Sequence, residues 1–182
     1  MKKLIIAALA LATFAIAPNA NAQTKMVGGA EMYPTKNIVE NAVNSKDHTT
    51  LVAAVKAAGL VETLESAGPF TVFAPTNEAF NKLPAGTVDN LVKPENKATL
   101  TKILTYHVVA GKLSAADLWV KVKTGMGKAE LNTVSGGKLT VMAKGKKLYL
   151  VDEKGGKSWI TIADVNQSNG VIHVVNAVLM PN

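Results

Sequence analysis

Apolar residues recur three or four positions apart in the first part of the chain, between residues 35 and 65. This period predicts a group of amphipathic helices. Thr35 is the expected N-cap of the first helix. A second helix is expected over residues 47–58, with Gly59 in the left-handed conformation after its last turn.

The period changes abruptly inside the stretch GPFTVFAPTNEAFNKLP. Its first half, around Phe73, has the two-residue period of a strand and is rich in aromatic and β-branched side chains. Pro75 has no N–H group, so the strand ladder should end there. Thr76 is the expected N-cap of a helix that begins at Asn77 and buries Phe80. The stretch is thus predicted to be a corner between a strand and a helix, which needs no catalytic role to explain it.

Two more helices are expected, one over residues 87–92 and a longer one over residues 94–104. At Tyr106 and His107 the pattern becomes that of a strand. The sequence SAAD, which begins at Ser114, has the spacing of a helix capping box.

The rest of the chain has mainly the pattern of strands. Short strands separated by glycine-containing turns are expected at residues 131–134, 139–143, 148–151 and 159–165. Asn169 and Gly170 predict a turn, after which VIHVVNAVLM should form a long closing strand. Because helices cluster early and strands late, the predicted class is α+β with an antiparallel sheet.

Residues 1–22 have the pattern of a secretory signal peptide. Two lysines precede a largely apolar run of 14 residues, Leu4 to Ala17, and Ala20-Asn21-Ala22 has the small residues that signal peptidase recognises. A membrane anchor is the alternative, but 14 residues are fewer than the roughly 20 that span a bilayer. We therefore expect an exported chain, periplasmic or extracellular, with a flexible start at 23–34, one domain at 35–182 and no transmembrane segment after cleavage.

The composition limits the chemistry that the chain can perform. It has no cysteine, which excludes disulfides, thiol catalysis and thiolate metal sites. The three histidines, at positions 48, 107 and 173, are far apart in the sequence, which argues against a metal site. The sequence contains neither a Gly-x-Ser-x-Gly elbow nor a phosphate-binding loop. We predict no enzymatic activity, no cofactor and no bound metal.

The positive charge is concentrated in one region. Without the two leader lysines the chain has 18 basic residues (20 minus 2) against 13 acidic ones, and every basic residue is a lysine. Nine of these lie in region 121–157, beside only three acidic residues, so the region is either a solvated surface or a contact surface for an acidic partner. Lysine lacks the planar fork with which arginine reads phosphate or guanine, so nucleic acid is not expected as a partner. The candidate contact residues of this region are Lys121, Lys123, Lys144, Lys146 and Lys147.

The chain resembles a fasciclin domain in three places. TVFAPTNEAFNKLP resembles the first conserved box of that family, NGVIHVVNAVLMP resembles the second, and Tyr106-His107 matches the tyrosine–histidine pair between them. The three motifs stand in the same order as in the family, although the segment between Ala110 and Asn169 is longer than in many members. The resemblance implies a compact, wedge-like β-sandwich of about seven strands with helices packed around it.

The resemblance also implies a class of function. Fasciclin domains occur in extracellular or surface-attached proteins that bind cells, matrix proteins or glycans, and in animal members the tyrosine–histidine region is implicated in integrin recognition. For this chain the implication is a secreted adhesion module for a surface protein, an anionic glycan or another envelope component, with Tyr106, His107 and the lysines as contacts. Some algal and bacterial relatives bind carotenoids in an apolar groove, so the alternative is a carrier of an apolar molecule such as a carotenoid or lipid.

His107 and His173 both lie in predicted strands inside these motifs. One interpretation is a paired binding or proton-transfer site. The other is that each ring is partly buried and hydrogen-bonded, with Thr76 and Asn77 as partners, and ties the strands to the corner. An unpaired buried polar group costs roughly 1–3 kcal/mol, which favours the second interpretation.

Overall fold

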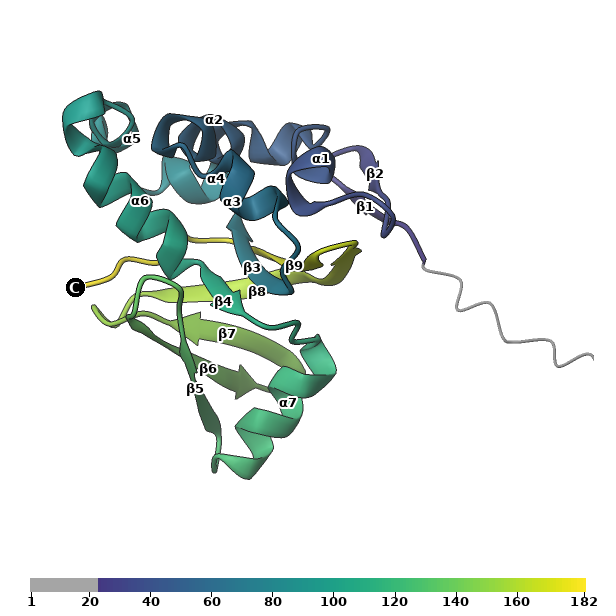
Figure 1. Ribbon diagram of the computed structural model, residues 1–182. Coiled ribbons are helices and arrows are strands. Elements are labelled where there is room, and N and C mark those ends of the chain that lie inside the picture. Colours follow the sequence, from purple (N-terminus) through teal and green to yellow (C-terminus); the bar gives the residue numbers. More distant parts are fainter. Residues whose placement is uncertain (1–22) are drawn as a thin grey trace, which may run out of the picture.

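The computed structural model describes residues 23–182, so the predicted signal peptide lies outside the described residues. Within this range the chain forms seven α-helices, two short 3-10 helices and nine strands. Helices α1 to α6 gather on one side of the main sheet, and α7 lies against the opposite lobe (Figure 1). The predicted α+β class is therefore confirmed.

The helices form largely where the apolar period predicts them. They are α1 (Ile38–Ala42), η1 (Lys46–His48), α2 (Thr49–Ala58), α3 (Val61–Glu65), α4 (Asn77–Asn81), α5 (Thr87–Leu91), η2 (Pro94–Asn96), α6 (Lys97–Tyr106) and α7 (Ala115–Thr124). Thr76 caps α4, Gly59 ends α2 with a φ of 71°, and Ser114 forms the expected capping box with Asp117. The predicted cap of α1 was wrong: Asn37, not Thr35, accepts the Glu40 N–H, because helix α1 begins later than its apolar period suggests.

The main sheet contains seven strands. In spatial order they are β4 (Val108–Ala110), β3 (Phe70–Pro75), β9 (Gly170–Val175), β8 (Lys157–Gln167), β7 (Lys147–Val151), β6 (Lys138–Lys144) and β5 (Lys128–Asn132). All neighbours are antiparallel except β3 and β9, which run parallel from Phe70 opposite Gly170 to Pro75 opposite Val175. The expectation of a wholly antiparallel sheet was therefore wrong, because the closing strand inserts next to a strand made much earlier in the chain.

The two outer strands of this sheet bend towards each other. Val109 of β4 forms a bridge with Thr133, just after β5, and the Val134 N–H donates to the Val108 carbonyl at 2.8 Å. The sheet is therefore nearly closed. It has two separate cores, one beneath α1 to α6 that includes Ile38 and Leu104, and one between α7 and strands β5 to β7.

Two segments differ from their predicted conformation. Residues 23–34, expected to be a flexible start, contain a hairpin of β1 (Lys25–Val27) and β2 (Ala30–Met32) whose residues Val27 and Met32 are buried in the helix-side core. The closing strand ends at Val175 rather than continuing along the apolar run, because the Asn176 side chain takes over the Trp159 N–H at 2.9 Å.

Candidate functional site

Tyr106 and His107, expected on a strand, lie at the end of helix α6. Tyr106 is the last residue of the helix and His107 is its C-cap, and strand β4 begins only at Val108. The Tyr106 side chain is fully buried and His107 is 3% exposed. The strand prediction is wrong here because a short apolar run at a buried helix end has the same pattern as a buried strand. Neither side chain is available to a partner at the surface.

The phenol of Tyr106 joins helix α6 to the opposite lobe. Its Oη donates to the Lys138 carbonyl at 2.6 Å and accepts from the Glu153 N–H at 3.1 Å. Burial raises the pKa of Tyr106 to about 12. The side chain is therefore a fixed link between α6, strand β6 and the β7–β8 turn.

His107 joins the same helix end to the C-terminal segment. The Leu179 N–H donates to Nε2 at 3.0 Å, so Nε2 carries no proton and Nδ1 donates to the Ile103 carbonyl at 2.8 Å. Burial lowers the pKa of the ring to about 4, so it is neutral at pH 7. Both nitrogens are occupied by the main chain.

His173 has a similar environment in strand β9. It is fully buried and stacks on Phe73 with the ring centroids 5.7 Å apart. The Asp164 N–H donates to Nδ1 at 3.2 Å, and Nε2 donates to the Leu113 carbonyl at 2.8 Å. Burial lowers the pKa of this ring as well. His173 therefore fastens the segment before α7 to the centre of the sheet.

Thr76 and Asn77 are not the partners of these rings, contrary to expectation. Thr76 Oγ1 accepts the Ala79 N–H at 3.3 Å as the cap of α4. Asn77 Oδ1 accepts the Thr50 N–H at 3.0 Å, and Asn77 Nδ2 donates to the Lys46 carbonyl at 2.8 Å. Because His107 and His173 bond to separate main-chain groups instead, the geometry favours structural roles over a paired proton-transfer site.

We expect the free energy of unfolding to fall as the pH is lowered from about 6.5 to about 4. A histidine in the unfolded chain titrates near pH 6.5, whereas His107 in the folded chain is protonated only near pH 4. Between these values the unfolded state binds more protons, so acid favours unfolding, and His107 alone accounts for about 3 kcal/mol. The pKa values of His173 and His48 are also lowered by burial and act in the same direction.

Urea unfolding at a series of pH values gives the slope of the free energy of unfolding against pH. In His107→Gln, which keeps a polar side chain but does not titrate, the slope should be smaller. A stability that stays constant between pH 6.5 and 4 would show that the buried rings are protonated without cost.

The predicted contact lysines come together at one end of the lobe that contains α7 and strands β5 to β7. Two of them lie in the last turn of α7, and the chain then reaches β5, whose first residue faces Met142 on β6. The others lie at the β6–β7 turn, two residues beyond Met142, where Lys144 pairs with Lys147. We call this surface the lysine end; it consists of Lys121, Lys123, Lys128, Lys144, Lys146 and Lys147.

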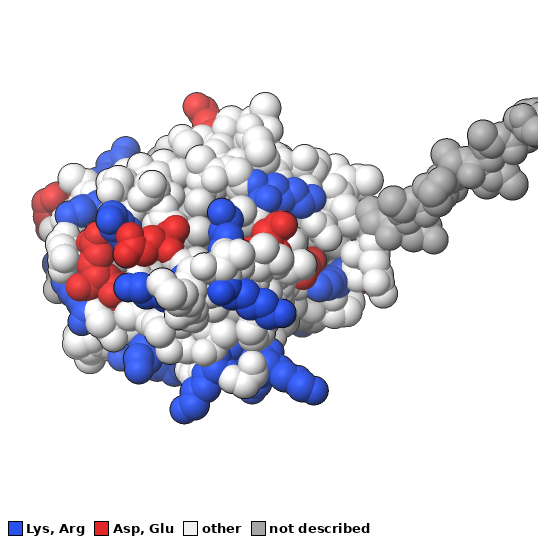
Figure 2. All heavy atoms as spheres, turned by 90° about the horizontal axis from the view of Figure 1, so that it is seen from below, with Lys and Arg blue, Asp and Glu red and all other residues white. Residues whose placement is uncertain are grey.

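All six side chains of the lysine end are exposed. The salt bridge found within residues 23–182 is elsewhere on the lobe, between Lys138 and Glu130 at 3.1 Å. The other two acidic residues of region 121–157 accept main-chain hydrogen bonds: Asp152 from Gly156 at 2.6 Å, and Glu153 from Lys138 at 2.9 Å. In Figure 2, which views the molecule from below, lysines project over much of the surface and the largest acidic group lies at one side.

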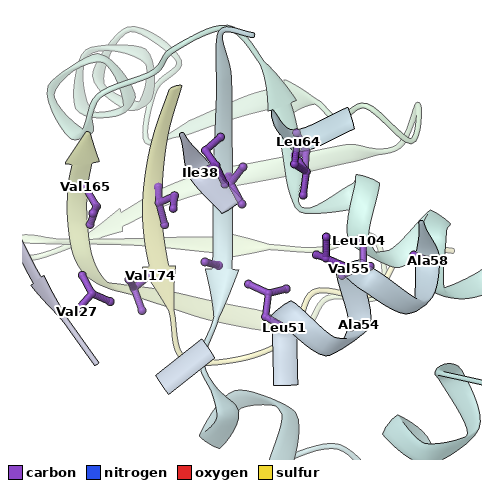
Figure 3. Close-up of a cluster of buried hydrophobic side chains, with 14 of the residues drawn as sticks. Val27, Ile38, Leu51, Ala54, Val55, Ala58, Leu64, Leu104, Val165 and Val174 are labelled. Carbon is purple, nitrogen blue, oxygen red and sulfur yellow. The ribbon is translucent and has the colours of Figure 1, made fainter. Parts of the chain in front are cut away.

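An apolar cavity of about 80 Å³ lies in the helix-side core. Its wall is formed by the β1–β2 hairpin, by helices η1, α1, α2, α3 and α6, and by strands β3, β4, β8 and β9. Figure 3 shows part of this wall, with side chains that include Val27, Ile38, Leu51, Val55, Leu64 and Leu104. The volume equals several water-sized spheres of roughly 10–15 Å³ each, and a cavity with apolar walls tends to stay dry.

His48 lines this cavity. It ends the short helix η1, is 3% exposed, and bonds through Nδ1 to the Ser45 Oγ at 2.8 Å. Its Nε2 is buried without a hydrogen-bond partner among residues 23–182. No local pattern singles out His48, because its surroundings are assembled from segments far apart in the chain.

Two features are absent within residues 23–182: a cluster of metal ligands and a helix that could span a membrane. In this range no group of three or more His, Cys, Asp and Glu side chains is arranged to hold a metal ion. Nor does any helix in the same range have the length and apolar character needed to cross a bilayer.

The chain matches the family model of the fasciclin domain over residues 46–181. It is 47% identical over 175 residues to Protein sll1483 of Synechocystis, and the alignment covers 96% of this chain and 90% of that protein. It is 40% identical over 145 residues to the immunogenic protein MPB70 of Mycobacterium bovis, and the alignment covers 77% of this chain and 66% of that protein.

A solved structure shows the same fold. The FAS1 domain pair of the insect cell adhesion molecule fasciclin I aligns with a TM-score of 0.71 at 19% identity, covering 81% of this chain and 52% of that chain. The match includes most of the described helices and strands.

Proposed function

Because the chain belongs to the fasciclin domain family, we propose that it is an exported, non-enzymatic adhesion module that attaches to an anionic glycan or another anionic component of the cell envelope. The observation that carries this proposal is the lysine end. Export is supported by the leader pattern of residues 1–22. Adhesion is supported by the shared fold with fasciclin I, an insect cell adhesion molecule.

The positive charge is unevenly distributed along the chain. Residues 23–182 carry a net charge of +5 (18 minus 13), of which region 121–157 contributes +6 (9 minus 3), so the remainder sums to −1. A molecule with one strongly positive region is steered towards an anionic surface in a defined orientation. The lysine end, which includes the last turn of α7, would then meet the surface, and helices α1 to α6 would face away from it.

Replacing Lys144, Lys146 and Lys147 by glutamine should weaken binding to anionic surfaces about 100-fold at low salt, since each lysine near such a surface contributes about 1 kcal/mol. The dissociation constant can be measured on immobilised polygalacturonate and on phosphatidylglycerol vesicles, which separates a glycan from a lipid. Binding of the unmodified protein should weaken steeply with salt, because exposed charges are screened beyond about 10 Å at 0.1 M.

The matched control replaces Lys46, Lys93 and Lys97, three exposed lysines on the helix side, by glutamine. It removes the same charge and should change the dissociation constant less than about threefold if the lysine end makes the contact. Equal losses of binding in the two triple variants would mean that net charge, and not the position of the lysines, determines the affinity. Binding that ignores salt would contradict an electrostatic attachment.

A second candidate function, a carrier of an apolar molecule, is favoured by the cavity in the helix-side core, whose volume of about 80 Å³ suits a small molecule or one end of a longer carotenoid or lipid. Adhesion requires no such cavity, and a well-packed core would fill it. Protein purified from its native host should then contain a stoichiometric apolar molecule. An absorption spectrum and mass spectrometry of an organic extract would detect it, and a protein that is empty by both measures would contradict this candidate.

A further inference from the structure

His48, one of the residues that line the cavity, has a buried ring nitrogen without a hydrogen-bond partner in the described part of the chain. Among residues 23–182, His48 Nε2 is the buried side-chain nitrogen or oxygen that has no hydrogen-bond partner. Nearly all buried polar groups in folded proteins are paired, because leaving one unpaired costs free energy. An exception beside a cavity therefore needs an explanation.

The protein atoms around the ring do not supply the missing partner. Burial lowers the pKa of His48, and the Ala74 carbonyl opposes this shift, but it forms no hydrogen bond of ordinary geometry with Nε2. The hydroxyl of Ser45 is engaged at Nδ1. The nitrogens of His107, another polar side chain of the wall, are bonded to Ile103 and Leu179.

A bound water is a poor substitute for a partner. A buried water normally makes two to four hydrogen bonds. Most of the cavity wall is aliphatic or aromatic, so a water at Nε2 would leave most of its own hydrogen bonds unmade. A molecule with an apolar body and one polar group fits the wall better.

We propose that the cavity binds an apolar molecule that carries a single hydroxyl group, and that this hydroxyl bonds to His48 Nε2. The inference rests on the carrier function proposed above and adds the anchoring residue and the class of ligand. If Ser45 Oγ donates to Nδ1, Nε2 carries the ring proton and is a donor; if Ser45 Oγ accepts from Nδ1, Nε2 is an acceptor. A hydroxyl satisfies both cases. A carboxylate fits less well, because burial keeps the His48 ring neutral.

Isopropanol and isobutane test the inference directly, because both are small enough for a cavity of about 80 Å³. They have the same shape, and a hydroxyl in the first replaces a methyl group in the second. Their dissociation constants can be measured by NMR titration of the chain without residues 1–22. His48→Leu should weaken isopropanol about five- to tenfold more than isobutane, the effect of one net hydrogen bond.

Two further measurements make the result interpretable. Val52→Phe narrows the cavity from α2, where Val52 is half-buried, and should weaken both probes to a similar extent. The 15N shift of His48 Nε2 in the unmodified protein should move with isopropanol and stay in place with isobutane. This second readout remains available if His48→Leu does not fold.

The outcomes separate the inference from the function on which it rests. If neither probe binds, or if Val52→Phe leaves both unaffected, the cavity is not a ligand site and both ideas fail. If both probes bind but His48→Leu affects them equally and the Nε2 shift does not move, the carrier function survives and the hydroxyl anchor is wrong. A selective loss of isopropanol binding in His48→Leu supports both.

Discussion

Replacing Gly170 by alanine should lower the free energy of unfolding by at least about 3 kcal/mol. Gly170 is the first residue of β9 and lies opposite Phe70 on the parallel strand β3. A Cβ atom at this position would lie 2.1 Å from the Phe70 carbonyl oxygen and 2.9 Å from its carbon. Both are main-chain atoms, so the two strands at the centre of the sheet would have to separate. Urea unfolding gives the loss.

Gly145→Ala is the matched control for this effect. Gly145 has a φ of 60°, and no heavy atom lies within 4 Å of the position that a Cβ atom would take there. Alanine at that site bears only the conformational cost of the left-handed region, about 1–2 kcal/mol. A loss in Gly170→Ala no greater than in this control would mean that β3 and β9 can move apart easily.

The second large effect is expected for His107→Ala, with a loss of about 3–4 kcal/mol. The substitution leaves the Leu179 N–H and the Ile103 carbonyl without their partners in the core and also creates a void. Helix α6 and the C-terminal segment would lose their buried connection through the ring. Thermal and urea unfolding measure the change.

His48→Leu provides the contrast, although it too removes a buried histidine. It deletes an atom that has no partner, Nε2, and loses one bond to Ser45. Its effect on the free energy of unfolding should therefore be much smaller than that of His107→Leu, the same substitution at the ring whose two nitrogens are both bonded. Similar losses in the two leucine variants would mean that burial of the ring, rather than its hydrogen bonds, makes His107 important.

The features that could be predicted from the sequence depend on neighbours along the chain. Thr76, Gly59 and Ser114 act on groups at most four residues away, and each has the predicted role. The strand that ends at Pro75 was equally predictable, because a missing N–H is a property of the residue itself. Tyr106 was misplaced because a short, largely apolar run cannot distinguish a buried helix end from a buried strand.

The features that could not be predicted depend on contacts between distant segments. The parallel pairing of Phe70 with Gly170 joins residues 100 positions apart (170 minus 70), and no local sequence pattern predicts it. The cavity beside His48 is bounded by the hairpin, four α-helices, the short helix η1 and four strands of the main sheet. The lysines were visible as a composition, but their meeting at one end follows from the β5–β6 and β6–β7 register.

The position of β9 also determines when this protein can fold. Of the nine described strands β9 comes last along the chain, yet it lies between β3 and β8 in the sheet. Until residues 170–175 are available, β3 and β8 have no common neighbour, and closing so long a loop is slow. A chain still emerging from the ribosome therefore lacks the middle of its own sheet. This order of events suits the export proposed above, because a chain that cannot finish folding early remains thin enough to thread through a translocation channel and completes its structure on the far side.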